Sequence, residues 1–531
     1  MFKRGLSQFV KLAPKTWQAV LNWLQLAVLF APSAWMLLRI NPLWRDIDGY
    51  NQVTLPPGPM TILQFSPLYC FGARIPLYLG CAYQAIVDRG DLPGWAFFGS
   101  PTLTDPGVFL LVTFQHLFLL GAQWFLLRSI QANPVTKVIL AALLALNAPF
   151  YTYTHSIGAE ALSLSATLLV LGCALLVWRQ RHIKRSAWVW FGLCLALCVL
   201  TRPINAVLGM LLPAAFILQA TAETAQSTIR RSGARFPRRL IKRRLFLCGL
   251  SLAVAALSFV VADRTVRYVC RAAKIKYRST VGQSFAWRLN FLAQMDETER
   301  SRMLGRLAER IGDPVVKEMI AATPSGISGP GRWDPQVCTN KFVEVIEQHS
   351  NIGTDLSYHL DLYRNRLARL FLLSFEKPFL DAVRSDFSSA FDISPREVAT
   401  FPIATTRYCF NRIQEMPRLA NLATFRGSTA DAALAAQERI TYYRLLDVPF
   451  RNLLLVWATL TLAVFAAKHG RKVVSFSIAL ICTGITMVLL TCFLSELLPR
   501  FTLPFWVVYV TATLLSVERI CDRIVARIIR T

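Results

Sequence analysis

Two aspartates two residues apart are the sharpest candidates for chemistry in this sequence. Asp46 and Asp48 lie in the stretch Arg45-Asp46-Ile47-Asp48-Gly49-Tyr50, shortly after a long apolar segment ends. Two carboxylates at this spacing can act as a general base, bind a divalent metal such as Mg²⁺ or Mn²⁺, or do both. The alternative is a polar turn that caps a helix, where aspartate is favoured for its local hydrogen bonds. Tyr50 is a further candidate for contact with a substrate.

Glu160 and His155 lie together at the start of another apolar segment. An ionised side chain at the centre of a membrane span costs on the order of 2.5–3.5 kcal/mol, so membrane acids usually face a site or a partner. A glutamate in the first turn of a helix is also explained by the helix dipole. His155 is a candidate binding residue, and an interfacial residue without such a role is the alternative.

Arg202 and Arg500 each lie beside a proline at the end of an apolar segment. Guanidinium groups suit phosphate recognition because they donate two parallel hydrogen bonds. The alternative is a side chain that snorkels from the membrane toward water. For Arg500, Glu496 offers a simple ion-pair partner.

The elements that must position these residues are membrane spans. The chain has 531 residues, of which 54% are hydrophobic and 17% charged, and its mean hydropathy is +0.41. This composition leaves too little polar surface for several soluble domains. A spanning helix needs about 20 mostly apolar residues. The segments that approach this length are 18–38, 107–127, 135–151, 159–178, 187–200, 203–219, 245–262, 452–467, 473–494 and 502–517. We therefore expect an all-α polytopic membrane protein with about ten transmembrane helices.

The remaining sequence divides the chain into three parts. We expect a transmembrane core over 1–262, with a first external loop over 39–106 in which the apolar segment 62–80 lies in the interface or re-enters. Residues 263–450 carry 26 basic and 21 acidic residues and show amphipathic helical spacing, so they predict a mostly helical external domain. Residues 451–531 predict the last spans, followed by a basic interfacial helix from Ser516 to Thr531.

The net charge of +27 reports the orientation of the chain in the membrane. If the N-terminus is cytoplasmic, the six inner segments (1–17, 128–137, 179–186, 220–244, 468–472 and 518–531) carry 25 basic residues against three acidic ones. Cytoplasmic loops rich in Lys and Arg follow the positive-inside rule. Both termini are therefore expected inside, and nucleic acid is not an expected partner.

This topology brings the candidate residues to one face. Asp46, Asp48, Glu160, Arg202 and Arg500 come from separate stretches but should all lie at the external ends of spans. Carboxylates for an acceptor and arginines for a phosphate indicate group transfer from a lipid phosphate. Nucleotide sugars and ATP are generally absent outside the cytoplasm, so a membrane-carried donor is expected.

The sequence resembles the GT-C superfamily of glycosyltransferases that use polyprenyl-phosphate sugars. The resemblance rests on Asp46-Ile47-Asp48, Pro67-Leu68-Tyr69, Ser156-Ile157-Gly158-Ala159-Glu160, Leu200-Thr201-Arg202-Pro203 and Pro499-Arg500-Phe501-Thr502-Leu503-Pro504, in this order and topology. It implies inverting transfer of a sugar on the non-cytoplasmic face, with Asp46 or Asp48 as general base and the other as support or metal ligand. It also implies a dolichyl- or undecaprenyl-phosphate donor and a glycan, glycolipid or protein acceptor. We expect a bacterial inner-membrane protein whose site faces the periplasm.

Two other functions remain open. A polymerase or ligase of lipid-linked glycans would use a large external loop with Arg and His, and 263–450 offers Arg364, Arg366, His349 and His359. A lipid or solute transporter would show related halves and charged helices at the middle of the membrane. Twelve cysteines are mostly within spans, where they act as small hydrophobic residues, although Cys70 and Cys81 form a possible disulfide pair. A divalent metal is the one cofactor considered.

Overall fold

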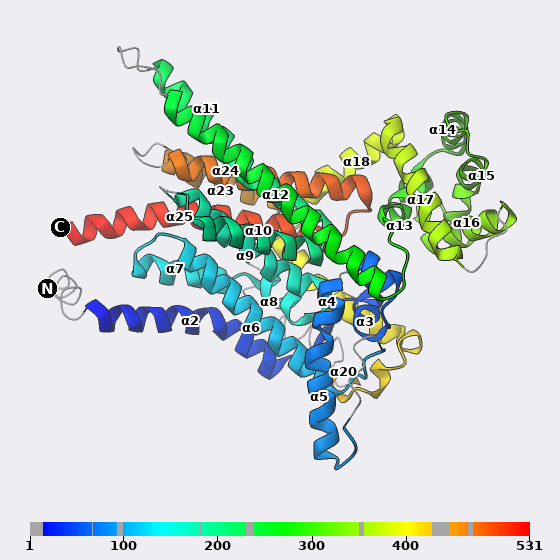
Figure 1. Ribbon diagram of the computed structural model, residues 1–531, viewed down its shortest axis with the longest axis horizontal. Helices are drawn as coiled ribbons and strands as arrows, with labels where there is room; N and C mark the ends of the chain where they lie inside the picture. The colour runs from blue at the N-terminus through cyan, green and yellow to red at the C-terminus, as the bar shows by residue number, and fades with distance from the viewer. Residues whose placement is uncertain are drawn as a thin grey trace.

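The computed structural model describes residues 14–65, 67–92, 99–180, 183–229, 238–349, 355–426, 447–465 and 471–530. Long helices run side by side along one axis and form a bundle (Figure 1). The helices that cover the predicted spans are α2 (Pro14–Arg39), α6 (Asp105–Ser129), α7 (Pro134–Ala145) with α8 (Ala148–Thr154), α9 (Ala159–Arg179), α10 (Arg185–Thr201), η2 (Pro203–Met210) with α11 (Leu211–Ile229), α12 (Arg238–Ala272), α23 (Phe450–Phe465), α24 (Arg471–Leu494), and η7 (Pro499–Thr502) with α25 (Leu503–Arg530).

The predicted fold class is confirmed. Within the described residues, seven helices are long and apolar enough to cross a membrane, and the pair α7 and α8, bent by 60°, makes an eighth. The apolar helices α10 and α23 are shorter, with 17 and 16 residues. All ten segments expected to span are thus helical, and the protein is an all-α polytopic membrane protein.

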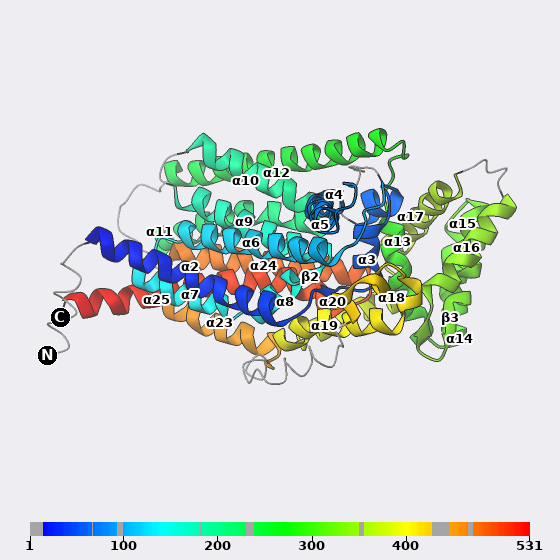
Figure 2. The same cartoon turned by 90° about the horizontal axis from the view of Figure 1, so that it is seen from below.

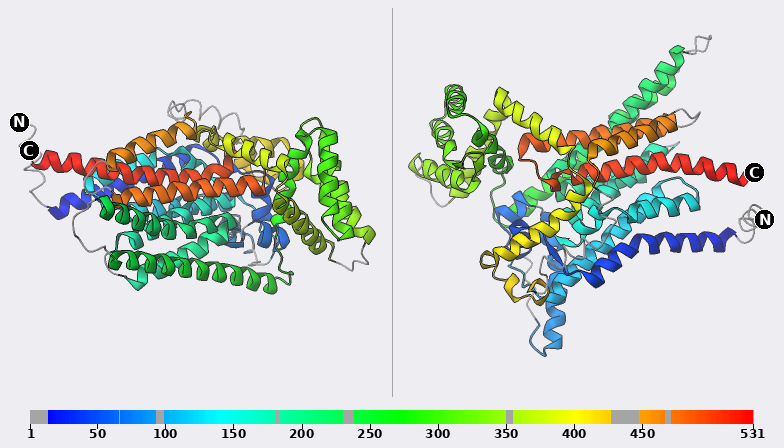
Figure 3. Two further views of the ribbon diagram at one scale, coloured as in Figure 1. Left: turned by 90° about the horizontal axis from the view of Figure 1, so that it is seen from above. Right: turned by 180° about the vertical axis from the view of Figure 1, so that it is seen from behind.

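The ends of the bundle differ. The start of α2 and the end of α25 lie at one end, and the compact group of helices between α13 and α17 lies at the other (Figures 1 and 3). This arrangement agrees with the expectation that both termini lie on one side and the large external segment on the opposite side. Residues 230–237 of the most basic inner segment lie outside the described ranges.

The apolar part of the first loop is helical, and its last helix lies at a steep angle to the spans. It begins with η1 (Met60–Gln64) and α4 (Pro67–Gly72) and continues as α5 (Arg74–Val87). Figures 1 and 2 show α5 at a steep angle to the spans. One face of α5 exposes large hydrophobic side chains, those of Ile75, Leu79, Tyr83 and Ile86. A helix with such an exposed apolar face suits the membrane interface, as predicted for 62–80.

The external segment contains two parts with different packing. The first part consists of α13 (Val281–Arg288), η3 (Leu289–Gln294), α14 (Glu297–Glu309), α15 (Pro314–Ala322), η4 (Thr323–Gly326), the hairpin β3 (Ile327–Gly329) and β4 (Arg332–Trp333), α16 (Pro335–His349) and α17 (Leu356–Ser374). The second part returns to the bundle as α18 (Lys377–Ala390), α19 (Pro395–Asn411), η5 (Ile413–Glu415), η6 (Leu419–Asn421) and α20 (Ala423–Arg426). Helix α18 packs on α24, and α19 packs on α8. The second part therefore covers the transmembrane core.

The C-terminal basic stretch differs from expectation. We predicted a separate interfacial helix from Ser516, but α25 continues without a break for 28 residues. Ser516 and Glu518 are buried in the bundle. The reason is that no proline or glycine follows Pro504 in this segment, while the apolar residues keep their helical spacing to Val525. Among the cysteines, all of which lie in the described ranges, no disulfide forms, so the suggested Cys70–Cys81 bridge is absent.

Candidate active site

A very short pair of strands holds the first loop against the beginning of α9. Strand β1 (Leu43–Trp44) pairs in parallel with β2 (Ser156–Ile157). The amide of Arg45 continues this ladder by donating to the carbonyl of Ile157 at 3.4 Å. On its other side, the backbone N–H of Trp44 donates to the hydroxyl of Thr406 on α19 at 2.8 Å. The residues after Trp44 are therefore fixed beside Glu160.

Asp46 caps the short helix α3 (Ile47–Thr54). Its Oδ1 accepts hydrogen bonds from the amides of Asp48 at 2.9 Å and Gly49 at 3.3 Å. Its backbone has a φ of 103°, a region that costs a non-glycine residue about 1–3 kcal/mol and that is often found at functional sites. The turn is tight, because a Cβ on Gly49 would lie 2.4 Å from the carbonyl oxygen of Ile157. The helix-capping alternative is thus correct for Asp46, and it brings both aspartates to the site.

Six charged side chains meet here, and we call them the charge cluster: Arg45, Asp46, Asp48, Glu160, Arg202 and Arg500. Arg45 is central to it, because it donates to Oε1 of Glu160 and lies 3.0 Å from Oδ2 of Asp48 and 3.4 Å from Oδ1 of Asp46.

The two other arginines approach from the later spans. Arg202, between α10 and η2, donates to Oε1 of Glu160 at 3.0 Å. Arg500, in η7, donates to Oδ2 of Asp46 at 2.6 Å, and its Nη2 lies 3.9 Å from Oδ2 of Asp48. With three guanidinium groups and three carboxylates, the charge cluster has no formal net charge. The candidate residues from four segments thus lie within ion-pair distance of one another.

The side chains of the charge cluster differ in exposure to solvent, which is lowest at Glu160 and highest at Asp48. The side chains of Glu160 and Arg45 are 2% and 5% exposed, whereas that of Asp48 is 31% exposed. Burial raises the pKa of Asp48 above its ordinary value of 3.8, and Arg45 partly offsets this rise. The open side of the cluster is therefore the side of Asp48, whose carboxylate holds protons more readily than an ordinary aspartate.

Arg45 is the residue that sequence reasoning missed. In the structure it lies within ion-pair distance of all three carboxylates and is almost fully buried. The sequence signal for this role is the position of Arg45 directly before Asp46. The first external loop otherwise carries few basic residues.

His155 lies inside the protein and does not join the charge cluster. Its ring is 1% exposed, with Nε2 at 2.9 Å from the carbonyl of Ile40 and Nδ1 at 3.0 Å from Nε2 of His116. Nδ1 of His116 in turn lies 2.9 Å from the hydroxyl of Ser33. Burial lowers the pKa of His155 to about 4. Every ring nitrogen in this series of hydrogen bonds has a partner when both rings are neutral and each donates one hydrogen bond and accepts one. We therefore assign His155 a positioning role.

Tyr50 and Tyr69 also have structural surroundings. Tyr50 is 7% exposed and packs in a core that includes Trp44 and Val53. The hydroxyl of Tyr69 accepts a hydrogen bond from the amide of Gly158 at 2.9 Å and donates to Gln115 at 2.9 Å. Tyr69 therefore fixes the turn that precedes Glu160.

The two aspartates do not fit a metal site. Each faces a guanidinium group, and Asp46 uses Oδ1 to cap α3. Within the part of the chain that the structure describes, no three His, Cys, Asp or Glu side chains gather closely enough to hold an ion. The divalent ion that the sequence suggested therefore stays a prediction.

The residues suggested for a polymerase or ligase lie in the α13–α17 group and have local partners. Arg364 donates to Thr339, and Arg366 pairs with Asp313. His349 lies 2.7 Å from a carboxylate oxygen of Glu318, while His359 contacts the ring of Tyr358. These four residues are engaged separately and do not join the charge cluster.

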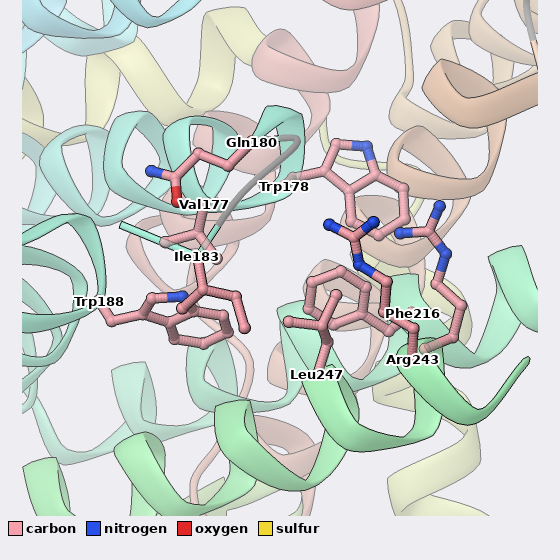
Figure 4. A pocket seen from close by; sticks show the side chains of 9 residues that line it. Val177, Trp178, Gln180, Ile183, Trp188, Phe216, Arg243 and Leu247 are labelled. Atoms are coloured by element: carbon pink, nitrogen blue, oxygen red, sulfur yellow. The ribbon is translucent and has the colours of Figure 1, made fainter. Parts of the chain in front are cut away.

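A small pocket lies near the end of α9 that is far from Glu160, and Figure 4 shows the side chains that line it. It is formed where α9, α10, α11 and α12 meet, and its walls include Trp178, Trp188, Phe216 and Leu247. Arg243 also lines it. Because α9 runs from Glu160 at one end to Trp178 near the other, this pocket is separated from the charge cluster by the length of a span.

Comparison with known proteins gives similarities of fold. No family model and no curated protein matches this sequence. Similar solved structures include the archaeal oligosaccharyltransferase AglB from Archaeoglobus fulgidus, in complex with an inhibitory peptide and a dolichol-phosphate. The identity is 12% and the TM-score 0.41, with coverage of 97% of this chain and 51% of AglB. The chain thus spans about half the length of AglB.

ArnT from Cupriavidus metallidurans is also similar, in its apo state and bound to undecaprenyl phosphate. The identity is 12% and the TM-score 0.28, with coverage of 96% of this chain and 78% of ArnT. At these TM-scores the similarity concerns the general arrangement of helices.

Proposed function

We propose that this protein transfers a sugar from a polyprenyl-phosphate donor to an acceptor on the side of the membrane opposite its termini. The observation that supports this most directly is the charge cluster, in which Arg500 pairs with the first-loop carboxylates and Arg202 pairs with Glu160 at the ends of membrane spans. Guanidinium groups at this depth suit a lipid phosphate, and a carboxylate beside them suits an acceptor that must lose a proton. The positive-inside distribution of charge supports a site on the non-cytoplasmic face, which is the periplasmic face if the protein lies in a bacterial inner membrane.

The proposed reaction is a single displacement. The acceptor group, such as a hydroxyl, gives its proton to a carboxylate while its heteroatom bonds to the anomeric carbon of the sugar. The bond between that carbon and the phosphate oxygen breaks, and its electrons leave with the phosphate. Arg202 and Arg500 would stabilise the charge that develops on this leaving group. Attack from the face opposite the phosphate inverts the anomeric configuration.

Asp48 is the better candidate for the general base. The carboxylate of Asp46 is occupied, with Oδ1 capping α3 and Oδ2 held by Arg500 at 2.6 Å. Asp48 is more exposed, at 31% against 17%, and its pKa is raised by burial. A base with a raised pKa accepts a proton more readily near neutral pH. Asp46 then supports the turn and orients Arg500.

The test is transfer by the purified protein in liposomes, supplied with a panel of sugars on undecaprenyl phosphate and dolichyl phosphate. Asp48→Asn should lower kcat by about 10²–10⁴-fold without changing thermal stability. Asp91→Asn, which removes an exposed carboxylate in the same loop, is the matched control and should behave as wild type.

Two results would contradict the proposal. Equal transfer by wild type and Asp48→Asn would remove Asp48 as base, and retention by Asp46→Asn as well would favour the polymerase or ligase. Movement of a labelled lipid across the bilayer without any transfer would favour a transporter.

A further inference from the structure

Arg500 faces a conflict between two roles. Its Nη1 is hydrogen-bonded to Oδ2 of Asp46 at 2.6 Å, and its Nη2 lies 3.9 Å from Oδ2 of Asp48. The ring of Phe501 lies under the guanidinium, 5.0 Å from its centre, and helps to hold it there. In this arrangement the guanidinium proposed to hold a phosphate is already bound to the carboxylates proposed to handle the acceptor.

The pairing weakens both partners. A carboxylate that accepts a hydrogen bond from an arginine is a poorer base, because the charge favours its ionised form. A guanidinium bound to a carboxylate must give up that partner before it can form a bidentate contact with phosphate. Arg500 is therefore held by Asp46, and its positive charge, 3.9 Å from Asp48, makes the proposed base weaker than it would be without that charge.

Among the three arginines of the charge cluster, Arg500 is the one placed to change partners. Arg45 is 5% exposed and is held by three carboxylates. Arg202 pairs with Glu160, which is 2% exposed and which also receives Arg45. Arg500 and Arg202 are similarly exposed, at 14% and 17%, but Asp46 is 17% exposed whereas Glu160 is 2% exposed. An incoming anion can therefore reach the Arg500–Asp46 pair more easily than the Arg202–Glu160 pair.

The guanidinium also has unused capacity. Nε of Arg500 is buried and has no hydrogen-bond partner among the described residues. A phosphate on the side of Nε and one Nη nitrogen would satisfy it, since phosphate oxygens accept such paired hydrogen bonds. The positive and negative groups of the charge cluster balance. A donor phosphate adds a further anion, and this anion competes with Asp46 for the hydrogen-bond donors of Arg500.

We propose that the donor phosphate takes Arg500 from Asp46, so that the guanidinium moves away from Asp48 and this carboxylate becomes a stronger base only after the donor has bound. This inference rests on the proposed function and adds an order of events to it. Before the donor binds, Asp46 occupies the hydrogen-bonding position at Arg500 that the phosphate then takes. Arg500 thereby has a counter-charge before the donor binds. Asp48 becomes a stronger base only once the donor sugar is present.

The test is a binding measurement that needs no turnover. Undecaprenyl phosphate is titrated against the purified full chain in detergent, and the dissociation constant is compared between wild type and Asp46→Asn. Asparagine caps helices as well as aspartate does, so α3 should be retained. If Asp46 occupies Arg500 in most molecules, removing its charge should tighten lipid-phosphate binding by about five- to tenfold, since affinity scales with the fraction of the competent state.

Three further variants complete the design. Asp48→Asn should tighten binding less than Asp46→Asn, because its carboxylate lies 3.9 Å from Arg500, and it replaces Asp46→Asn if that variant does not fold. Arg500→Gln should weaken binding by about tenfold or more. Asp91→Asn should bind as wild type.

The outcomes separate the two proposals. Tighter binding by Asp46→Asn, together with lost transfer, supports the exchange of Arg500. Equal or weaker binding by both aspartate variants, while wild type binds, overturns the exchange and leaves the proposed function in place. Failure of wild type to bind undecaprenyl phosphate or to use any polyprenyl-phosphate sugar overturns the proposed function itself.

Discussion

Helix α9 carries a buried ion near each end, and the two are paired in different ways. Near the inner end Arg179 donates to Glu518 of α25 at 2.6 Å, and Glu518 is fully buried. At the outer end Glu160 is shared between Arg45 and Arg202, and these connect to further carboxylates. One pair joins two helices. The other is a network in which every ion except Arg202 has more than one partner.

This difference separates a structural role from a functional one. A buried charge with a single partner holds two elements together, and its loss leaves the partner uncompensated. A charge with several partners can exchange one of them for a ligand at a smaller cost. The inner pair is reinforced by Asp522 of α25, which accepts hydrogen bonds from Asn133 at 2.5 Å and Thr136 at 2.8 Å. We therefore expect the inner pair to govern stability and the charge cluster to govern transfer.

The largest expected change is in stability. Glu518→Gln leaves Arg179 buried without its counter-charge and should lower the free energy of unfolding by about 3–5 kcal/mol. Transfer per folded molecule should stay within about twofold of wild type, because the site lies a span away. Thermal unfolding in detergent, followed by an activity assay of the folded fraction, measures both. A large loss of specific activity would mean that the two ends of α9 are coupled.

At the outer end, Glu160→Gln should have the opposite profile. Arg45 and Arg202 lose their shared carboxylate, and a small displacement of the arginines is expected to lower kcat by about 10²-fold. The measurement is kcat and KM for a polyprenyl-phosphate sugar, normalised to folded protein. Near-normal transfer by a stable Glu160→Gln would place Glu160 with the structural pair.

A smaller effect is expected at His155, which touches the strand pair and not the site. His155→Ala breaks the hydrogen bonds to Ile40 and His116 and should lower kcat by about tenfold while KM changes little. His155→Gln keeps a donor for the carbonyl of Ile40 and should recover part of the loss. If neither variant changes kcat, the histidine chain contributes only to folding.

The smallest expected effect is a pH dependence. Because burial raises the pKa of Asp48, this carboxylate becomes protonated as pH falls through a value above 3.8, and a protonated base cannot accept the proton of the acceptor. Transfer should therefore decline on the acid side, and the residual activity of Asp48→Asn should lack this decline. An acid limb at the ordinary aspartate value in wild type would argue against a buried base.

Much of the fold could be predicted, because hydropathy alone separates spans from loops. All ten segments are helical, and the exposed apolar face of α5 agrees with the predicted interfacial segment. The return of α18 and α19 could not be predicted in the same way. An amphipathic helix has the same sequence pattern whether it packs in a separate domain or against membrane helices.

The candidate site was predictable only in part. Topology placed Asp46, Asp48, Glu160, Arg202 and Arg500 at one face, and the structure brings their side chains together. The role of Arg45 depends on a strand of two residues, which is too short to leave a periodic signal. The burial of His155 depends on His116, a residue of a different helix, and no pattern in the sequence links the two.

The contact between Trp44 and Thr406 has a consequence for biosynthesis. Trp44 is made early, but the hydroxyl that holds its backbone is more than 350 residues further along the chain, and Arg500 comes later still. The first spans can enter the membrane as soon as they leave the ribosome, yet the first loop acquires its final neighbours only after Thr406 and Arg500 have been synthesised. A nascent chain is therefore inserted before it is competent, and truncated products would occupy the membrane without activity.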